Sequence, residues 1–225
     1  CAFPALQSEE SSFCFLPILW NYGGSLAQID SPAGRQAFGF LKQLAENKAL
    51  SEDNVNMTIS DIAWEFANGN IAMAFLTSGY ENEIREENPD LHFATTKLPC
   101  GENSITISGG EVLTVTCAEH EKEAREFVRF MEQPEQTEVY LDSMGYLAAR
   151  RDLLKKQIQT DPAKKTYWSY LKQAKFREIE PYWPSLSMEV AESINRVILG
   201  EDTQDELEQL SERISRIRRA KYEKE

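Results

Sequence analysis

Residues 58–80 constrain the fold most, because they read as a helix, a tight turn and a strand in direct succession. The sequence predicts that the helix is capped by Ser60 or Asp61 and ends at Asn68-Gly69, a pair that readily reverses the chain. The apolar side of this helix consists of Ile62, Trp64, Phe66 and Ala67. Residues 71–76 are all apolar, as in a strand covered on both faces, so the stretch predicts an α/β fold.

This strand is followed by Thr77-Ser78-Gly79-Tyr80, a turn of small residues that ends in one aromatic ring. Ligands of open α/β sheets bind beyond the carboxyl ends of strands, so Tyr80 is a candidate ligand-binding residue. The alternative is a half-buried tyrosine in a solvent loop. The stretch alone leaves both interpretations open.

Composition limits the possible partners. The chain has 225 residues, of which 41% are hydrophobic, and this is enough for one large core or two small ones. A net charge of -13 without a basic stripe argues against a nucleic-acid partner. No apolar run reaches the roughly 18 residues that span a bilayer. The four cysteines, Cys1, Cys14, Cys100 and Cys117, form no CxxC pair, so neither a zinc knuckle nor a dense disulfide scaffold is predicted.

The remaining chain reads as helices alternating with short strands. Residues 11–22 contain Pro17 and are predicted to form only a helical turn or two. Ser31-Pro32 begins a helix with Phe38 and Leu41 on its inward face. Strands are predicted over 91–99 and, on both sides of Gly109-Gly110, within 104–117. Helices are predicted over 81–88, 119–132 and 134–145, and two more within 150–180, the second of which begins at Asp161-Pro162. An irregular segment over 179–187 is followed by a helix over 188–199 and by a last helix, which begins with a capping box of Thr203 and Glu206.

Residues that carry catalytic or metal chemistry are scarce. His92 and His120 are isolated, so no metal site is predicted, and no phosphate-binding or dinucleotide motif indicates a cofactor. A catalytic carboxylate pair cannot be chosen from 37 acidic residues. Basic residues end the last helix, where they complement the helix dipole; the alternative is an interaction patch. These residues are Arg213, Arg216, Arg218, Arg219 and Lys221.

Several aromatic residues stand at the ends of predicted elements: Phe13, Trp20, Tyr80, Tyr182 and Trp183. Aromatic rings offer flat apolar faces that suit the C–H faces of a pyranose, while neighbouring carboxylates and amides bind the hydroxyls. Each ring taken alone is more readily explained as a core residue. Their shared position at element ends favours a binding surface.

The order of several short motifs supports this interpretation. They are WNYGG at 20–24, the SPAGRQAFGFLKQL helix, WEFANGNIAMAFLTSGY, KLP at 97–99, SGGEVLTVTC, the EKEAREFVRFM helix, GYLAAR at 145–150, and PYWP followed by a helix that ends in LGEDTQDEL. The series resembles the extracellular solute-binding proteins of bacterial ABC importers, in the sugar-binding group that includes maltose-binding protein. Its most specific pattern, F-x-x-G-x-x-A-M-x-x-x-x-G-Y, is carried by Phe66, Gly69, Ala72, Met73, Gly79 and Tyr80.

The resemblance implies two α/β lobes joined by hinge strands, with a sugar in the cleft between them and delivery of the closed form to an ABC permease. It implies ligand contacts from Phe13, Trp20, Tyr80, Gly110, Glu111 and Trp183. It implies no enzyme activity and no cofactor. Two positions depart from the pattern: Ala148 stands where many members have proline, and Glu111 where many have an aromatic residue.

Members of this family usually carry a further lobe, of the order of 100 to 200 residues, before the WNYGG motif. The chain is therefore expected to be a helix-rich, type II periplasmic-binding-protein-like lobe without most of the first lobe. Residues 1–98 and 132–225 are assigned to the second lobe, and residues 99–131 to the hinge crossing and the first lobe. Apolar residues of 104–131 would then lack their usual cover, and self-association of the chain is expected.

The leading functional hypothesis is reversible binding of a carbohydrate, in an extracellular lipoprotein or a periplasmic protein. Cys1 is not expected to be the lipid-modified cysteine, because that residue would precede the first lobe. The alternatives are a carbohydrate-processing enzyme, a sensor or scaffold lobe, and binding of another solute such as a polyamine.

Overall fold

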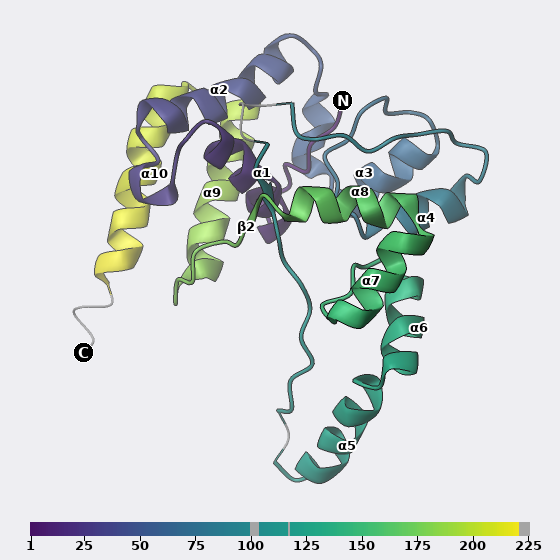
Figure 1. The fold of residues 1–225 in the computed structure, drawn as a ribbon. Coiled ribbons are helices and arrows are strands. Elements are labelled where there is room, and N and C mark those ends of the chain that lie inside the picture. The colour runs from purple at the N-terminus through teal and green to yellow at the C-terminus, as the bar shows by residue number, and fades with distance from the viewer. Residues whose placement is uncertain (100–103, 117, 221–225) are drawn as a thin grey trace.

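The computed structural model describes residues 1–99, 104–116 and 118–220, and in this part of the chain it consists mainly of helices. Figure 1 shows a body from which an arm projects. One side of the body contains α1 (Glu9–Asn21), α2 (Pro32–Glu46), α9 (Trp183–Ile198) and α10 (Thr203–Arg219), and the other contains α3 (Ile59–Ala67) and α4 (Tyr80–Glu87). The arm consists of α5 (Glu121–Met131), α6 (Pro134–Met144) and α7 (Arg151–Thr160), and α8 (Pro162–Leu171) returns from it to the body. Short 3-10 helices cover Leu26–Gln28 and Glu52–Asn56.

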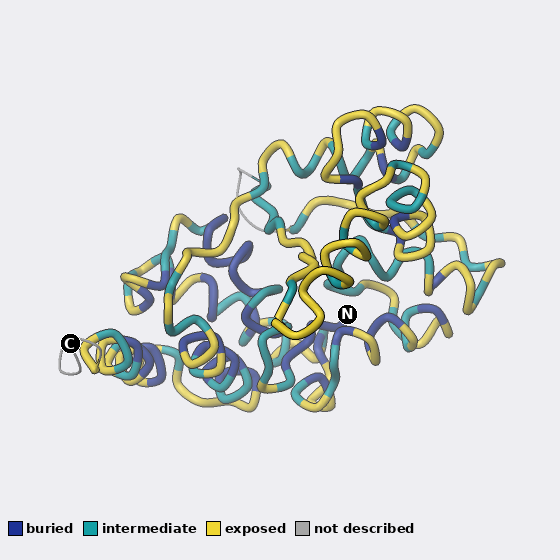
Figure 2. Tube along the Cα trace, turned by 90° about the horizontal axis from the view of Figure 1, so that it is seen from below, coloured by how far each residue is buried: buried dark blue, intermediate teal, exposed yellow. Residues whose placement is uncertain are grey.

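The largest core lies where α1, α2, α9 and α10 pack together, and Figure 2 shows the buried residues concentrated there. At its centre, the rings of Phe15 and Phe38 lie 4.4 Å apart between centroids, and both side chains are fully buried. A second, smaller core joins α3 to α4, and a third lies within the arm around Leu141 and Leu153. No described helix is both long and apolar enough to cross a membrane.

The start of α2 confirms the prediction from Ser31-Pro32. The Ser31 hydroxyl accepts a hydrogen bond from the Gly34 amide at 3.3 Å, and Pro32 occupies the first turn, where its missing N–H costs nothing. Ala37, Phe38 and Leu41 are buried, as the apolar spacing predicts. The cap therefore fixes the helix in the register that turns this face toward the core.

Gly34 is the one position of α2 where a side chain has no room. A Cβ built there would lie 1.7 Å from the carbonyl oxygen of Ile29, whereas a Cβ at Gly39 on the same helix would meet nothing within 4 Å. We expect Gly34→Ala to lower the free energy of unfolding by about 1–3 kcal/mol through overpacking, and Gly39→Ala to raise it by about 0.5–1 kcal/mol. Urea denaturation of both variants measures the difference, and equal effects at the two glycines would contradict the contact.

The helix of residues 58–80 is confirmed, but its cap and its apolar side differ from the prediction. Thr58, rather than Ser60 or Asp61, is the cap: its hydroxyl accepts from the Asp61 amide at 3.1 Å, and Asp61 accepts from the Thr58 amide at 2.8 Å. Trp64 is 55% exposed and does not share the buried face. Asn68 ends the helix, and Gly69 follows with φ +76°, as predicted.

The prediction of one or two helical turns for residues 11–22 is wrong, because α1 runs over 13 residues with Pro17 inside it. A proline in a helix interior removes one hydrogen bond and costs about 3 kcal/mol. Nine residues of α1 are buried, including Phe15, Ile18 and Leu19, so the burial of apolar area offsets this cost.

The predicted strands are mostly absent from the described residues. In 71–76, pairing is limited to one bridge between Ala74 and Ala2, and Met73 is 67% exposed, so this run is not covered on both faces. Residues 91–99 form no ladder, and the segment 104–116 pairs only through β1 (Thr106–Ile107), parallel to β2 (Ala174–Lys175). A strand needs neighbours on its edges, and these segments have few within the described chain.

The remaining helices agree with the sequence except at two starts. The predicted helices over 81–88, 119–132, 134–145 and within 150–180 are present as α4 to α8, and Gly145 ends α6 with φ +71°. By contrast, α9 begins at Trp183, so the predicted irregular segment is shorter. Asp202, not Thr203, caps α10 by accepting from the Gln204 and Asp205 amides. Cys100, Cys117 and Lys221 lie outside the described residues.

Candidate functional site

Tyr80 is the first residue of α4 and directly follows the turn of small residues. Its half-buried ring packs against the core of Ala63, Ala67 and Ile84. Burial raises the pKa of the Tyr80 hydroxyl, and the negative charges of Glu10 and Glu83 raise it further. The hydroxyl is therefore neutral at ordinary pH and lies close to α1, which carries Glu10.

Glu111 belongs to residues 108–116, which form neither helix nor strand. Figure 1 shows this extended segment leading from the body to the arm. Tyr140 of α6 donates a hydrogen bond to Glu111 Oε2 at 2.8 Å, and Tyr146, just after α6, donates to Oε1 at 3.0 Å. The hydrogen bond to Glu111 raises the pKa of Tyr140, while burial and then the same carboxylate raise the pKa of Tyr146. Both carboxylate oxygens are thus held in place, although the side chain is exposed to solvent.

Two glycines bring these groups close to the other predicted ligand residues. A Cβ at Gly79 would lie 2.7 Å from Tyr146 Cε1, so the Tyr146 ring packs against the turn before Tyr80. A Cβ at Gly109 would lie 3.2 Å from Phe13 Cε2 and Cζ, so the Phe13 ring lies over the backbone just before Glu111. We call Phe13, Tyr80, Glu111, Tyr140 and Tyr146 the candidate site. Gly110, which separates Gly109 from Glu111, is exposed.

The two predicted tryptophans have other contacts. Trp20 is 9% exposed and belongs to the main core, with Lys175 Nζ 6.0 Å from its ring centroid. Trp183 Nε1 donates to both carboxylate oxygens of Glu9 at 2.8 Å. Arg177 forms an ion pair with Glu9, and its guanidinium carbon lies 5.5 Å from the centroid of the Trp183 ring. The structure therefore gathers Phe13, Tyr80 and Glu111, while Trp20 and Trp183 have partners of their own.

Sequence reasoning did not single out Tyr140 and Tyr146. Tyr146 carried a signal, because it follows Gly145 in the GYLAAR motif and so stands at a helix end like the other candidates. Tyr140 lies inside α6 and carries no such signal. Its role depends on Glu111, which is 29 positions away in the sequence.

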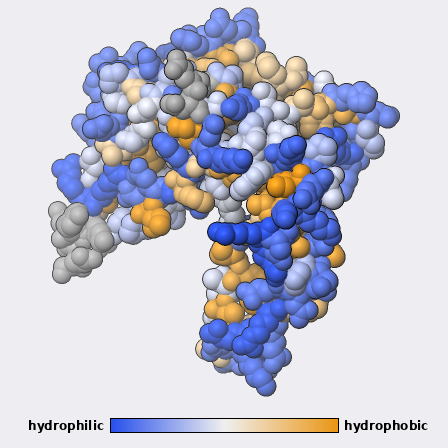
Figure 3. Space-filling model, viewed as in Figure 1, coloured by the Kyte–Doolittle hydropathy of each residue, from blue (hydrophilic) through white to orange (hydrophobic). Residues whose placement is uncertain are grey.

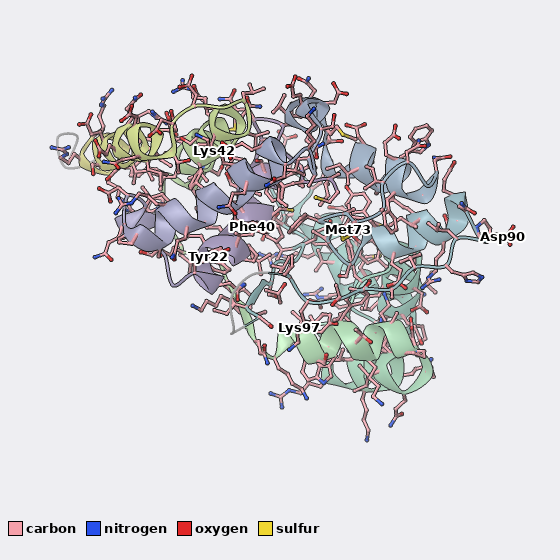
Figure 4. All side chains as sticks on the ribbon, turned by 90° about the horizontal axis from the view of Figure 1, so that it is seen from above. Tyr22, Phe40, Lys42, Met73, Asp90 and Lys97 are labelled. Carbon is pink, nitrogen blue, oxygen red and sulfur yellow. The ribbon has the colours of Figure 1, made fainter. Side chains whose placement is uncertain are left out.

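Two surface grooves lie outside the candidate site. One of about 470 Å³ lies between the end of α1 and α2, and Figure 4 shows Tyr22 and Phe40 from its wall as neighbours there. The other, of about 300 Å³, lies between α4 and the start of α8 and is lined by Glu81, Arg85 and Lys164 among others. Within the described residues, no group of three histidine, cysteine, aspartate or glutamate side chains is arranged to hold a metal ion.

Comparison with known proteins gives matches over most of the chain. Residues 5–166 match the family described as bacterial extracellular solute-binding protein. Binding proteins of Brucella abortus and Brucella suis are 19% identical in an alignment 206 positions long, which covers 87% of this chain and 50% of those proteins. The chain thus spans about half the length of these curated relatives.

Solved structures agree with the family match. Maltose-bound MalE3 of T. maritima superposes with a TM-score of 0.79 at 15% identity, over 95% of this chain and 59% of that protein. A solute-binding protein of an ABC transporter from Thermotoga lettingae, bound with α-D-tagatose, superposes with a TM-score of 0.77 at 18% identity, over 96% of this chain and 58% of that protein. The cyclic α-maltosyl-1,6-maltose binding protein of Arthrobacter globiformis superposes with a TM-score of 0.62 at 19% identity, over 93% of this chain and 56% of that protein. The chain therefore belongs to the bacterial extracellular solute-binding proteins, and its fold is a helix-rich, periplasmic-binding-protein-like lobe.

Proposed function

We propose that this chain binds a carbohydrate at the candidate site, as part of the substrate-binding component of an ABC importer, and delivers it to a membrane permease. The observation that carries the proposal is that Tyr146 both donates to Glu111 and packs on Gly79, which precedes Tyr80, while Phe13 packs on Gly109, two residues before Glu111. Aromatic faces for the C–H side of a sugar and a fixed carboxylate for its hydroxyls are the two parts that such a site needs. The similar structures with bound maltose and bound tagatose support the same class of ligand.

We further propose that residues 1–98 and 132–225 form the second lobe and that residues 99–131 cross to a first lobe, which other residues of the full-length protein form. The arm supports this arrangement, because none of the residues of α5 is buried and Phe127 and Phe130 are 55% and 47% exposed. Figure 3 shows a hollow between the body and the arm, with hydrophobic residues along the facing edge of the arm. A first lobe docked there would cover these side chains and close the site.

Binding without catalysis agrees with the family, whose named relatives are binding proteins. Extracellular location follows from the family description, and we propose a periplasmic or lipid-anchored form. Self-association of the chain through the segment 104–131 stays a prediction.

The candidate site is tested by Tyr80→Ala in the full-length protein. We expect at least a tenfold loss of sugar affinity, about 1.4 kcal/mol, with a melting midpoint close to that of the parent protein, because the Tyr80 ring is only half-buried. Calorimetry with a panel of mono- and oligosaccharides measures the affinity. Trp64→Ala is the matched control, because that ring is 55% exposed on α3 and lies outside the candidate site.

Two results would contradict the proposal. If the parent protein binds no sugar of the panel, carbohydrate binding is wrong. If Tyr80→Ala unfolds the protein while the folded fraction binds sugar normally, Tyr80 is a core residue and the candidate site is wrong.

A further inference from the structure

The candidate site contains one carboxylate, Glu111, which accepts hydrogen bonds from the hydroxyls of Tyr140 and Tyr146. Two further carboxylates, Glu10 and Glu83, lie near enough to Tyr80 that their negative charges, after burial, raise the pKa of its hydroxyl. Glu10 is fixed as well, because its Oε2 accepts the Ile59 amide at 2.9 Å. These carboxylates come from three separate parts of the chain: α1, α4 and the extended segment.

Neighbouring glutamates of the same elements are neutralised by arginines, but these three are not. Glu9 pairs with Arg177, and Glu81 pairs with Arg85 at 2.7 Å. Within residues 1–99, 104–116 and 118–220, no lysine or arginine forms an ion pair with Glu10, Glu83 or Glu111. The tyrosine hydroxyls add no positive charge, and Lys164, the lysine bonded next to Tyr146, donates to the Gly145 carbonyl rather than to one of these carboxylates. The three carboxylates therefore have no ion-pair partner among the described residues.

We propose that the preferred ligand is a saccharide that carries a protonated amine; this inference rests on the proposed function. An ammonium group supplies three hydrogen-bond donors and a positive charge, which complements Glu111 and the nearby Glu10 and Glu83. A neutral sugar would satisfy acceptors through its hydroxyls and leave the three negative charges without a partner. Phe13 and Tyr80 would serve both kinds of ligand, so the charge sets the preference between them.

Matched ligand pairs test this preference in the full-length protein. The pairs are glucosamine with glucose, galactosamine with galactose, and the β-1,4-linked glucosamine dimer with cellobiose. Calorimetry at about pH 6 keeps the amines charged, because their pKa values lie near those of α-amino groups. We expect at least tenfold tighter binding of the amine in one or more pairs, about 1.4 kcal/mol, and a smaller preference at high salt.

Glu111→Gln removes the charge and keeps groups that can bond to both tyrosine hydroxyls. We expect this variant to reduce the amine preference to less than about threefold, since the negative charge that Tyr140 and Tyr146 hold in place is gone. Glu212→Gln on α10 is the matched control, because it makes the same change in net charge at an exposed position of the body. This control should keep the full preference.

The outcomes separate the two proposals. Neutral sugars that bind as tightly as their amine partners would overturn the amine preference and leave carbohydrate binding intact. Retention of the full preference in Glu111→Gln would also overturn the inference, because the selectivity would then arise elsewhere. If no member of any pair and no other sugar binds, the proposed function itself fails, and the inference fails with it.

Discussion

Phe38→Ala is expected to lower the free energy of unfolding by about 3–5 kcal/mol, which is the range for truncating a buried aromatic residue. Phe38 is fully buried on α2, and its ring packs against Phe15 with centroids 4.4 Å apart. Alanine leaves a cavity that the helices around it cannot fill without moving. Urea denaturation of the 225-residue chain measures the loss.

Phe176→Ala is the control for this measurement, because it makes the same substitution at a side chain that is 75% exposed. We expect a change within about 0.5 kcal/mol for that variant. A Phe38→Ala variant that is as stable as Phe176→Ala would show that the Phe15–Phe38 contact is not part of the core.

Glu206→Ala is expected to lower the free energy of unfolding by about 3 kcal/mol, because it breaks a buried ion-pair network between α9 and α10. The Glu206 side chain is 4% exposed, and its Oε1 accepts from Ser193 and from Arg213, both at 2.6 Å. Arg213 keeps a second partner, Glu189, at 2.7 Å, which places the effect at the lower end of the range for buried pairs. Glu212→Ala, at an exposed position of the same helix, should change stability by less than about 0.5 kcal/mol.

The same network makes the Glu206 contribution depend on pH. Burial alone would raise the pKa of Glu206, but the hydrogen bonds from Ser193 and Arg213 and the charges of Arg213 and Arg196 outweigh it and lower the pKa. A lowered pKa in the folded state stabilises the protein above the unfolded value of about 4.3, and this contribution is lost as the pH falls through the folded pKa. Equal losses for Glu206→Ala at neutral pH and at a pH below the folded pKa would contradict this assignment.

The helices could be predicted because their signals are local. Ser31-Pro32, Asn68-Gly69, Pro134, Asp161-Pro162 and Gly145 each fix one helix end through bonds within a few residues. The start of α10 shows the limit of this reasoning. Glu206 has the spacing of a capping box, but its carboxylate is bound to Ser193 and Arg213, which no local pattern indicates.

The strands could not be predicted in the same way, because a strand is defined by its neighbours. Residues 71–76 have the apolar run of a buried strand, yet Ala74 pairs with Ala2 only, and Met73 is exposed. In α1 the error is the reverse, because a full helix is present where only a helical turn or two was predicted. Pro17 disfavours a continuous helix locally, but the burial of the surrounding residues outweighs the cost of the proline.

For the candidate site, individual residues could be chosen from the sequence, but the contacts between them could not be predicted. Phe13, Tyr80 and Glu111 could be named from their motifs, and the structure brings them together through Gly79 and Gly109. The Tyr140 contact to Glu111 depends on how the extended segment lies against α6. The ring of Trp20 shows that a position at an element end does not distinguish a core residue from a surface one.

The lack of buried residues in α5 also determines what an unfolding experiment on this chain reports. A helix of 11 residues that buries none of them is only marginally stable in water, so its amide hydrogens should exchange with solvent while the body remains folded. Helical circular dichroism then sums two processes, and a two-state fit to that signal would underestimate the cooperativity of the body. Fluorescence from Trp20, which is buried beside α2 and α9, follows the body and is one of the signals to use for Phe38→Ala and Glu206→Ala.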